Sequence, residues 1–205
     1  VVNSGQANAA TGEEGKQDNL VLAARTAETL GVQPGEVLVS STGVIGVRMN
    51  LEKLLPGLAL AARGLGDVLN NFALSIMTTD LVPKSSERDL VLSTGPVRIV
   101  GAAKGSGMIH PNMGTMLGFV LTDAAVEKSW LDAALREIAD ESFNMISVDG
   151  ETSTNDTFMV LANGASGAKA TSVADLELLK KGLREVAIDL AISIARDGEG
   201  ASKLI

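Results

Sequence analysis

PVRIVGAAKGSGMIHPNMGTMLGFVLTDA, residues 96–124, decides the fold because it contains two predicted strands and an unusual connection between them. Its two ends, PVRIVGAA and TMLGFVLTDA, are rich in β-branched and apolar residues, which favours strands. Residues 104–119 place four glycines, a proline and three methionines around one threonine, Thr115. Such a composition is not typical of a regular strand or helix, so we interpret the run as a functional loop that connects two strands.

The composition limits the kinds of protein that this chain can be. With 205 residues, 45% of them hydrophobic, it can build one substantial core or at most two small domains. The formal net charge of −8 leaves no basic face for phosphates, so we expect a small polar or cationic substrate and neither nucleic acid nor a membrane. The absence of cysteine excludes disulfides and thiolate chemistry, and no apolar run is long enough to span a bilayer. We expect a cytoplasmic protein.

Both ends of the chain are apolar, VVNSG at the start and ASKLI at the end. Free termini are usually polar and frayed. Two interpretations remain open, a piece cut from a longer polypeptide or terminal strands docked in a sheet.

Hydrophobic periodicity predicts helices separated by short strands. The helices cover residues 18–30, 50–65, 67–77, 127–140 and 172–196. Asp18, Asn50 and Ser172 with Asp175 are the predicted caps of the first, second and last of these helices. Gly31 should end the first helix, and Pro56 should interrupt the second. The strands cover residues 36–42, 96–103, 115–124, 145–150 and 157–164. This order favours an α/β fold with stacked β-sheets covered by helices, in which a glycine-rich turn can carry a catalytic group above a rigid sheet.

Two alternatives for the glycine-rich connection are disfavoured. The one histidine, His110, could form a Ser-His-Asp triad with Ser106 or Thr115, but a triad requires geometry, and a histidine before a proline is more simply a loop residue. GAAKGSG, residues 101–107, could hold a phosphate, yet it lacks the P-loop spacing and precedes β sequence. A glycine turn that lets backbones approach is the simpler interpretation.

VDGETSTND, residues 148–156, gathers Asp149, Glu151 and Asp156 and superficially suggests a calcium loop. It lacks the spacing of an EF-hand. We interpret it as a structural turn whose side chains bond the local backbone.

Thr115 is the strongest catalytic candidate. A threonine hydroxyl is a poor nucleophile near neutral pH and needs an adjacent base, which an N-terminal threonine supplies through its own amino group, with a pKa of about 8. That amine exists only if the Gly114/Thr115 bond is cut. Gly114, without a Cβ, tolerates the strained geometry from which the Thr115 hydroxyl attacks the preceding carbonyl.

Six ordered motifs along the chain carry a family resemblance: VNSGQANAATG, STGVIG, SIMTTDLVPK, AKGSGMIHPNMGTML, SFNMISVDGETSTNDT and RDGEGASK. With them the chain resembles the bifunctional ornithine acetyltransferase (glutamate N-acetyltransferase) family. The resemblance implies an αββα-like sandwich similar to that of N-terminal-nucleophile enzymes. It also implies self-cleavage between Gly114 and Thr115, so that residues 1–114 belong to an α chain and residues 115–205 to a β chain.

Family members are about twice as long as this chain. The resemblance therefore implies that residues 1–205 form the main catalytic domain and that a smaller C-terminal domain is missing. It further implies an α2β2 assembly.

The resemblance also assigns roles to single residues. The oxyanion pair of the family maps onto Thr42 and Gly43. Its substrate contacts map onto Thr78, Lys104, Thr115 and Glu199, with Lys104 suited to a substrate carboxylate and Glu199 to the ornithine ammonium. No metal and no cofactor are implied.

The implied reaction transfers the acetyl group of N2-acetylornithine to glutamate by a ping-pong mechanism through acetyl-Thr115. Use of acetyl-CoA as an alternative acetyl donor stays open, as does the choice between arginine biosynthesis and a specialised pathway. Two alternatives compete with this function. One is a related N-terminal-nucleophile amidohydrolase or aminopeptidase, and the other is a non-catalytic anion-binding α/β domain.

Overall fold

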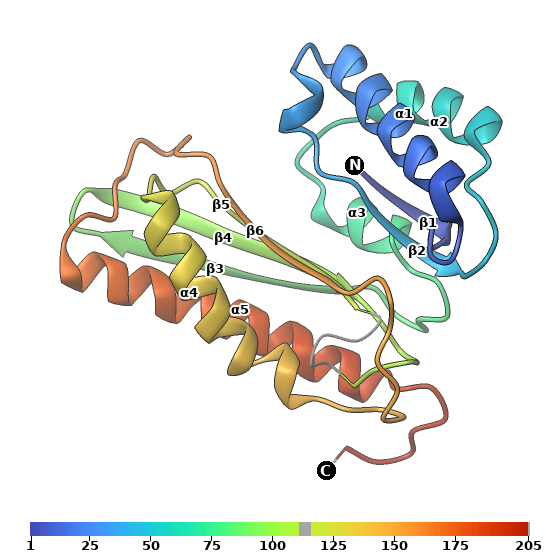
Figure 1. Cartoon of the computed structure of the whole chain (residues 1–205). Coiled ribbons are helices and arrows are strands. Elements are labelled where there is room, and N and C mark those ends of the chain that lie inside the picture. The colour runs from blue at the N-terminus through green and yellow to red at the C-terminus, as the bar shows by residue number, and fades with distance from the viewer. Residues whose placement is uncertain (111–115, 205) are drawn as a thin grey trace. The chain divides into compact units, whose positions relative to one another are not determined.

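A computed structural model describes residues 1–110 and 116–204. The chain divides into two compact units, Val1–Val68 and Leu69–Ile205. Both contain helices and strands, which confirms the predicted α/β class (Figure 1). The stacking of sheets into an αββα sandwich stays a prediction.

The first unit is built around two parallel strands, β1 (Val2–Gln6) and β2 (Ser40–Val44). The apolar start of the chain lies in β1, so the interpretation of a terminal strand docked in a sheet is right for this end and wrong for residues 201–204, which form no strand. Two helices, α1 (Gly12–Leu30) and α2 (Leu51–Arg63), pack together in this unit, and the short helix η1 (Pro34–Glu36) precedes β2. The predicted strand over residues 36–42 therefore starts later, at Ser40.

The helix ends of this unit correct two predictions. Asp18 is not a cap, because α1 starts at Gly12; Asp18 is buried inside the helix and accepts hydrogen bonds from Arg48 at 2.8 and 2.7 Å. Gly31 ends α1 in the left-handed conformation, as predicted. Asn50 caps α2 through the Lys53 N–H, but Pro56 does not interrupt the helix. Pro56 is the sixth residue of α2 and removes one backbone hydrogen bond, yet the helix continues to Arg63.

The second unit contains a four-stranded sheet in the order β3-β4-β5-β6. The pairs β3–β4 and β4–β5 are antiparallel, and β5–β6 is parallel. The predicted neighbours on either side of the glycine-rich connection, β4 and β5, are thus confirmed. The strands are β3 (Lys84–Leu92), β4 (Gly95–Lys104), β5 (Leu117–Thr122) and β6 (Thr157–Ala162).

Two strand predictions in this unit were incomplete or wrong. The sequence did not reveal β3, because the first six residues of KSSERDLVL are all polar and lack the polar/apolar alternation that predicts a half-buried strand. Residues 145–150 do not form the predicted strand. Instead, the short helix η2 (Phe143–Met145) leads into bends, and Val148 donates to the Ile109 carbonyl at 2.7 Å.

Helices cover both faces of this sheet. The helices α4 (Lys128–Asp140) and α5 (Val173–Arg196) lie on one face, and Ser172 caps α5 through the Asp175 N–H, as predicted (Figure 1). On β5, Phe119 faces the other side from Val120, because neighbouring strand residues point to opposite faces. Phe119 packs edge to face against Phe72 of α3 (Leu69–Ser75), so α3 covers part of the opposite face.

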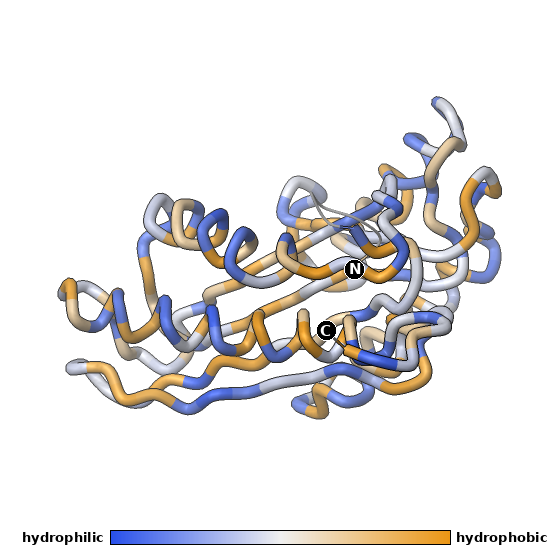
Figure 2. Tube along the Cα trace, turned by 90° about the horizontal axis from the view of Figure 1, so that it is seen from below, coloured by the Kyte–Doolittle hydropathy of each residue, from blue (hydrophilic) through white to orange (hydrophobic). Residues whose placement is uncertain are grey.

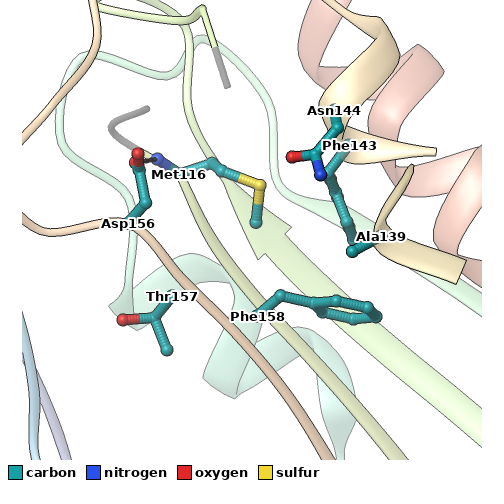
Figure 3. Close-up of a pocket in the computed structure, with 7 residues that line it drawn as sticks. All are labelled: Met116, Ala139, Phe143, Asn144, Asp156, Thr157 and Phe158. Atoms are coloured by element: carbon teal, nitrogen blue, oxygen red, sulfur yellow. Dashed lines mark hydrogen bonds between the residues drawn. The ribbon is translucent and has the colours of Figure 1, made fainter. Parts of the chain in front are cut away.

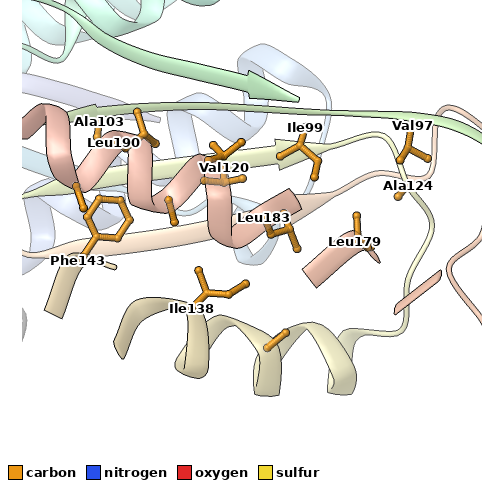
Figure 4. Packing of buried hydrophobic residues seen from close by; sticks show 14 of the residues in the cluster. Val97, Ile99, Ala103, Val120, Ala124, Ile138, Phe143, Leu179, Leu183 and Leu190 are labelled. Carbon is orange, nitrogen blue, oxygen red and sulfur yellow. The ribbon is translucent and has the colours of Figure 1, made fainter. Parts of the chain in front are cut away.

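The core lies between α5, α4 and the sheet (Figure 4). The hydrophobic periodicity that predicts α5 corresponds to a buried stripe, since Leu179, Leu183, Val186, Leu190 and Ile194 are all buried. Hydrophilic and hydrophobic residues alternate along the helices, as burial of one side requires (Figure 2).

Gly101 lets α5 approach β4 closely, since a Cβ there would lie 2.7 Å from Val186 Cγ1. Within the described ranges, no helix is long and apolar enough to cross a membrane.

Candidate active site

The glycine-rich connection leaves the sheet at the end of β4, where two polar side chains are buried. Lys104 is 4% exposed and Ser106 is 2% exposed. Burial lowers the pKa of Lys104, and the nearby Lys84 ammonium lowers it further, while the carboxylates of Asp80 and Asp156 act in the opposite direction. An ammonium held in this environment is a strong partner for a substrate anion.

Asp80 fixes the start of the connection. Its Oδ1 accepts hydrogen bonds from the Gly105 N–H and from Lys84 Nζ, both at 2.7 Å, and its Oδ2 accepts from the Thr78 N–H at 3.1 Å. Burial alone would raise the pKa of Asp80, but these hydrogen bonds outweigh burial and hold the pKa below its usual value. The Asp80 carboxylate therefore fixes the backbone at Thr78 and beside Lys104, two of the predicted substrate contacts.

Lys84 extends this cluster to the end of α5. Its ammonium lies 2.6 Å from Asp197 Oδ2, which also accepts from the Leu81 N–H at 3.0 Å. The side chains of Lys84, Asp80 and Asp197 are at most 5% exposed. A buried ion pair is held by good geometry and additional hydrogen bonds, and this cluster has both.

Ser106 brings two further segments to the connection. Its hydroxyl is 2.8 Å from the Thr79 hydroxyl, and its carbonyl accepts from the Glu199 N–H at 2.6 Å. A Cβ at Gly107 would lie 2.4 Å from Glu199 Oε2, so the Glu199 carboxylate lies directly against the connection. The predicted substrate contacts Thr78, Lys104 and Glu199 are thus assembled around residues 104–107.

Two carboxylates from the predicted turn at residues 148–156 also bind this region. Asp149 accepts from the Met108 N–H and from the Ile109 N–H, the latter at 2.9 Å, as well as from the nearby Glu151 N–H at 3.1 Å. Asp156 accepts from the Met116 N–H at 2.6 Å (Figure 3). The turn interpretation is therefore right for Asp149 in part and wrong for Asp156, which binds a residue 40 positions away.

The hydrogen bonds of the glycine-rich connection argue against a catalytic triad of His110 with Ser106 and against a phosphate site. His110 Nδ1 lies 3.1 Å from Ser147 Oγ, whereas the Ser106 hydroxyl is bonded to Thr79, so the two residues do not form the start of a triad. A phosphate cradle needs backbone N–H groups that point to the ligand. Those of Gly105, Met108 and Ile109 instead donate to the chain's own aspartates.

The predicted oxyanion pair lies in the first unit, on β2. Thr42 is 1% exposed and pairs with Ser4, and Gly43 pairs with Gly5. Gly43 has a φ of 127°, and a Cβ there would collide with the Gly5 carbonyl group, so only glycine fits. Gly114 and Thr115 lie outside the described residues, and their meeting with Thr42 and Gly43 stays a prediction.

The comparisons with known proteins decide the family. The ArgJ family model matches residues 1–205. The chain belongs to the ArgJ family. This membership confirms the resemblance that the six motifs suggested.

Relatives within the ArgJ family are similar over the whole chain. Proteins named "Arginine biosynthesis bifunctional protein ArgJ" from Bacillus licheniformis and Bacillus subtilis are 52% and 51% identical, over 100% of this chain and 51% of their own length. The chain thus spans about half the length of these relatives. A crystal structure of an ArgJ protein from Bacillus halodurans is 38% identical and covers 54% of this chain and 59% of that chain, with a TM-score of 0.49.

Sequence reasoning did not single out several site residues of this ArgJ-family chain. Asp80 and Lys84 stand in SIMTTDLVPK and Asp197 in RDGEGASK, but the resemblance assigned roles only to Thr78 and Glu199 there. In a single sequence, one lysine and two aspartates give no signal of burial. The proline and the four-residue spacing between Asp80 and Lys84 do not predict their contact either.

Proposed function

We propose that this chain is the nucleophile-bearing part of an acetyltransferase of arginine biosynthesis, which moves the acetyl group of N2-acetylornithine to glutamate. The observation that carries this proposal is the assembly of Thr78, Lys104 and Glu199 around residues 104–107, in a chain of the ArgJ family. The names of the relatives place those proteins in arginine biosynthesis.

The reaction starts after the Gly114/Thr115 bond has been cut. The free amine of Thr115 takes the proton of its own hydroxyl, and the hydroxyl oxygen attacks the acetyl carbonyl of N2-acetylornithine. The Thr42 hydroxyl and the Gly43 N–H stabilise the oxyanion, which is typically worth about 3 to 4 kcal/mol per donor. Ornithine leaves with a proton from the amine, and glutamate then attacks acetyl-Thr115 to give N-acetylglutamate.

Two oppositely charged groups suit the two amino acids. The Lys104 ammonium, at the buried end of β4, pairs with a substrate carboxylate. The exposed Glu199 binds the side-chain ammonium of ornithine. These two contacts make the site selective for an acetylated diamino acid over a plain acetyl ester, because Lys104 binds a negative group of the substrate and Glu199 binds a positive one.

The proposal includes the assembly of the enzyme. Self-cleavage yields an α chain with residues 1–114 and a β chain with residues 115–205, which pair as α2β2 in the cytoplasm. Acetyl-CoA serves as a further acetyl donor only if the same acetyl-Thr115 forms from it. No metal or cofactor takes part in this scheme.

The test is to express the protein at full length and determine intact masses and N-terminal sequences under denaturing conditions. We expect two chains, one of which begins Thr-Met-Leu-Gly-Phe, and transfer of acetyl from N2-acetylornithine to glutamate. Thr115→Ala should give a single, inactive chain, whereas the exposed Thr171→Ala should behave as wild type. A wild-type chain that stays uncut on long incubation would rule the mechanism out.

The two alternatives from the sequence give different results in the same experiment. An amidohydrolase would release acetate at the same rate with and without glutamate. An anion-binding domain would keep its ligand after Thr115→Ala, but the occupied N–H groups of Gly105, Met108 and Ile109 argue against it.

A further inference from the structure

The backbone of Glu199 is bound to the connection two residues after Lys104. The Glu199 N–H donates to the Ser106 carbonyl at 2.6 Å, and the Ser106 hydroxyl is 2.8 Å from the Thr79 hydroxyl. Ser106 is buried, so both bonds are shielded from water. Glu199 is therefore attached to the same short stretch of chain that begins with Lys104, although the proposed function gives these two residues opposite substrate charges to bind.

The segment that carries Glu199 is held a second time, two residues earlier. Asp197 Oδ2 lies 2.6 Å from the Lys84 ammonium, which also lies 2.7 Å from Asp80 Oδ1. Asp80 in turn accepts from the Gly105 N–H at 2.7 Å. These buried bonds lead from the start of the connection to the end of α5, so the backbone on both sides of the site is fixed.

The side chain of Glu199 lies against Gly107 of the connection. A Cβ built on Gly107 would be 2.4 Å from Glu199 Oε2, whereas ordinary van der Waals contacts begin at about 3.4 Å. The carboxylate thus occupies space that any side chain at position 107 would need. The backbone of Gly107 is not in the left-handed region, so alanine fits its conformation. What glycine supplies at this position is room for the Glu199 carboxylate.

N2-Acetylornithine presents two charges, its carboxylate and its side-chain ammonium, at a spacing set by the length of its side chain. N2-Acetyllysine carries the same two charges one methylene group further apart. An ion pair requires a nitrogen and an oxygen within about 4 Å of each other. A site that fixes both of its own charged groups therefore favours one length of diamino acid.

We propose that Gly107 determines the length of the diamino acid that the enzyme deacetylates. Because it has no side chain, the Glu199 carboxylate lies against the connection, at a separation from Lys104 that matches ornithine. A side chain at position 107 would displace this carboxylate by about 1 Å, and a misplacement of that size can cost about 100-fold in rate. Gly107 acts through Glu199 and is a positioning residue. This inference rests on the proposed function.

The test compares Gly107→Ala with wild type in the full-length, self-cleaved enzyme. In a ping-pong reaction, kcat/KM for the acetyl donor and kcat/KM for glutamate report separate half-reactions. We expect kcat/KM for N2-acetylornithine to fall at least about 10-fold, while the values for N2-acetyllysine and for glutamate fall by less than about threefold. Glutamate is spared because it carries a carboxylate where ornithine carries its ammonium, and so gains nothing from Glu199. Gly57→Ala, in open space on α2, should leave all three values unchanged.

A double-mutant cycle tests whether Gly107 acts through Glu199. Glu199→Gln keeps the size of this exposed side chain but removes its charge, and it should lower kcat/KM for N2-acetylornithine by about 10- to 150-fold. In that background, Gly107→Ala should cause a further loss of less than about threefold, because the two residues act on the same contact.

Three results would overturn the inference. The first is an unchanged preference for N2-acetylornithine over N2-acetyllysine in Gly107→Ala. The second is an equal loss for both donors and for glutamate, and the third is a full loss from Gly107→Ala after Glu199→Gln. If the wild type transfers acetyl from N2-acetylornithine in these cases, only the role of Gly107 fails; if it never does, the proposed function fails with it.

Discussion

Lys84 and Asp197 form a buried ion pair, with Nζ 2.6 Å from Oδ2, although 113 positions separate them in the sequence. The pair joins the start of β3 to the end of α5, next to Glu199. Removing one partner of a buried pair leaves an uncompensated charge and typically costs about 3–5 kcal/mol. Lys84→Met should lower the free energy of unfolding in urea by that amount. Lys128→Met, which removes an exposed ion pair, should change it by less than about 1 kcal/mol.

Asp80 should make the protein sensitive to acid. Its pKa in the folded state is below the ordinary value, so its stabilising effect is fully present above about pH 4 and is lost as the pH falls below that value. Asp80→Asn should lower the free energy of unfolding at pH 7 by about 3 kcal/mol. The gap to wild type should shrink between pH 4 and pH 2. A gap of equal size at pH 7 and pH 3 would contradict this assignment.

Substitution of Gly101 by alanine should lower the stability of the protein, whereas substitution of Gly57 by alanine should raise it. A Cβ at Gly101 would press against Val186 and Leu190 at 2.7 and 2.9 Å, and overpacking of this kind costs about 1–3 kcal/mol. Gly57 lies on the exposed side of α2 with open space around it, so Gly57→Ala should stabilise α2 by about 0.5–1 kcal/mol. Thermal unfolding of the two variants checks both signs, and stabilisation by Gly101→Ala would show that α5 can move away from β4.

Asp156 should lower the stability of the folded protein at neutral pH. Its folded-state pKa of about 6 lies above the ordinary aspartate value, so stability is highest below about pH 4 and falls as the pH rises to 6. Asp156→Asn should therefore raise the free energy of unfolding at pH 8 by roughly 1–2 kcal/mol and have little effect near pH 4. Stabilisation at pH 8 would show that burial of the Asp156 carboxylate is unfavourable. Destabilisation at pH 8 would instead indicate a structural residue.

Lys104 should matter for acetyl transfer more than for folding. Loss of a hydrogen bond to a charged group costs about 1.5–3 kcal/mol, so Lys104→Met should lower kcat/KM for N2-acetylornithine roughly 10- to 150-fold. Because burial already disfavours the ammonium, the free energy of unfolding should not fall in parallel. Steady-state kinetics and urea unfolding of the same sample test both parts, with Lys128→Met as the control. Unchanged kinetics would remove Lys104 from the binding site.

The sequence predicted those parts of the fold that have a local signature. The stripe on α5, the Ser172 cap and the strands on either side of the connection all depend on spacing within a few residues. The strand β3 was missed because its first six residues are all polar. Asp18 was misread because a buried aspartate paired with Arg48 looks like a cap in the sequence. Contacts such as Asp156 with Met116 depend on strand register over 40 positions, which single-sequence patterns do not encode.

The antiparallel pairing of β4 with β5 has a consequence for the mature enzyme. Self-cleavage would place these neighbouring strands in different polypeptides, with α5 in the same product as β5. The hydrogen bonds between β4 and β5 and the shared hydrophobic core would then hold two separate polypeptides together. Unfolding would release two partners, so the melting temperature should rise with protein concentration. Recovery from denaturant should follow second-order kinetics, and the uncut precursor should show neither dependence.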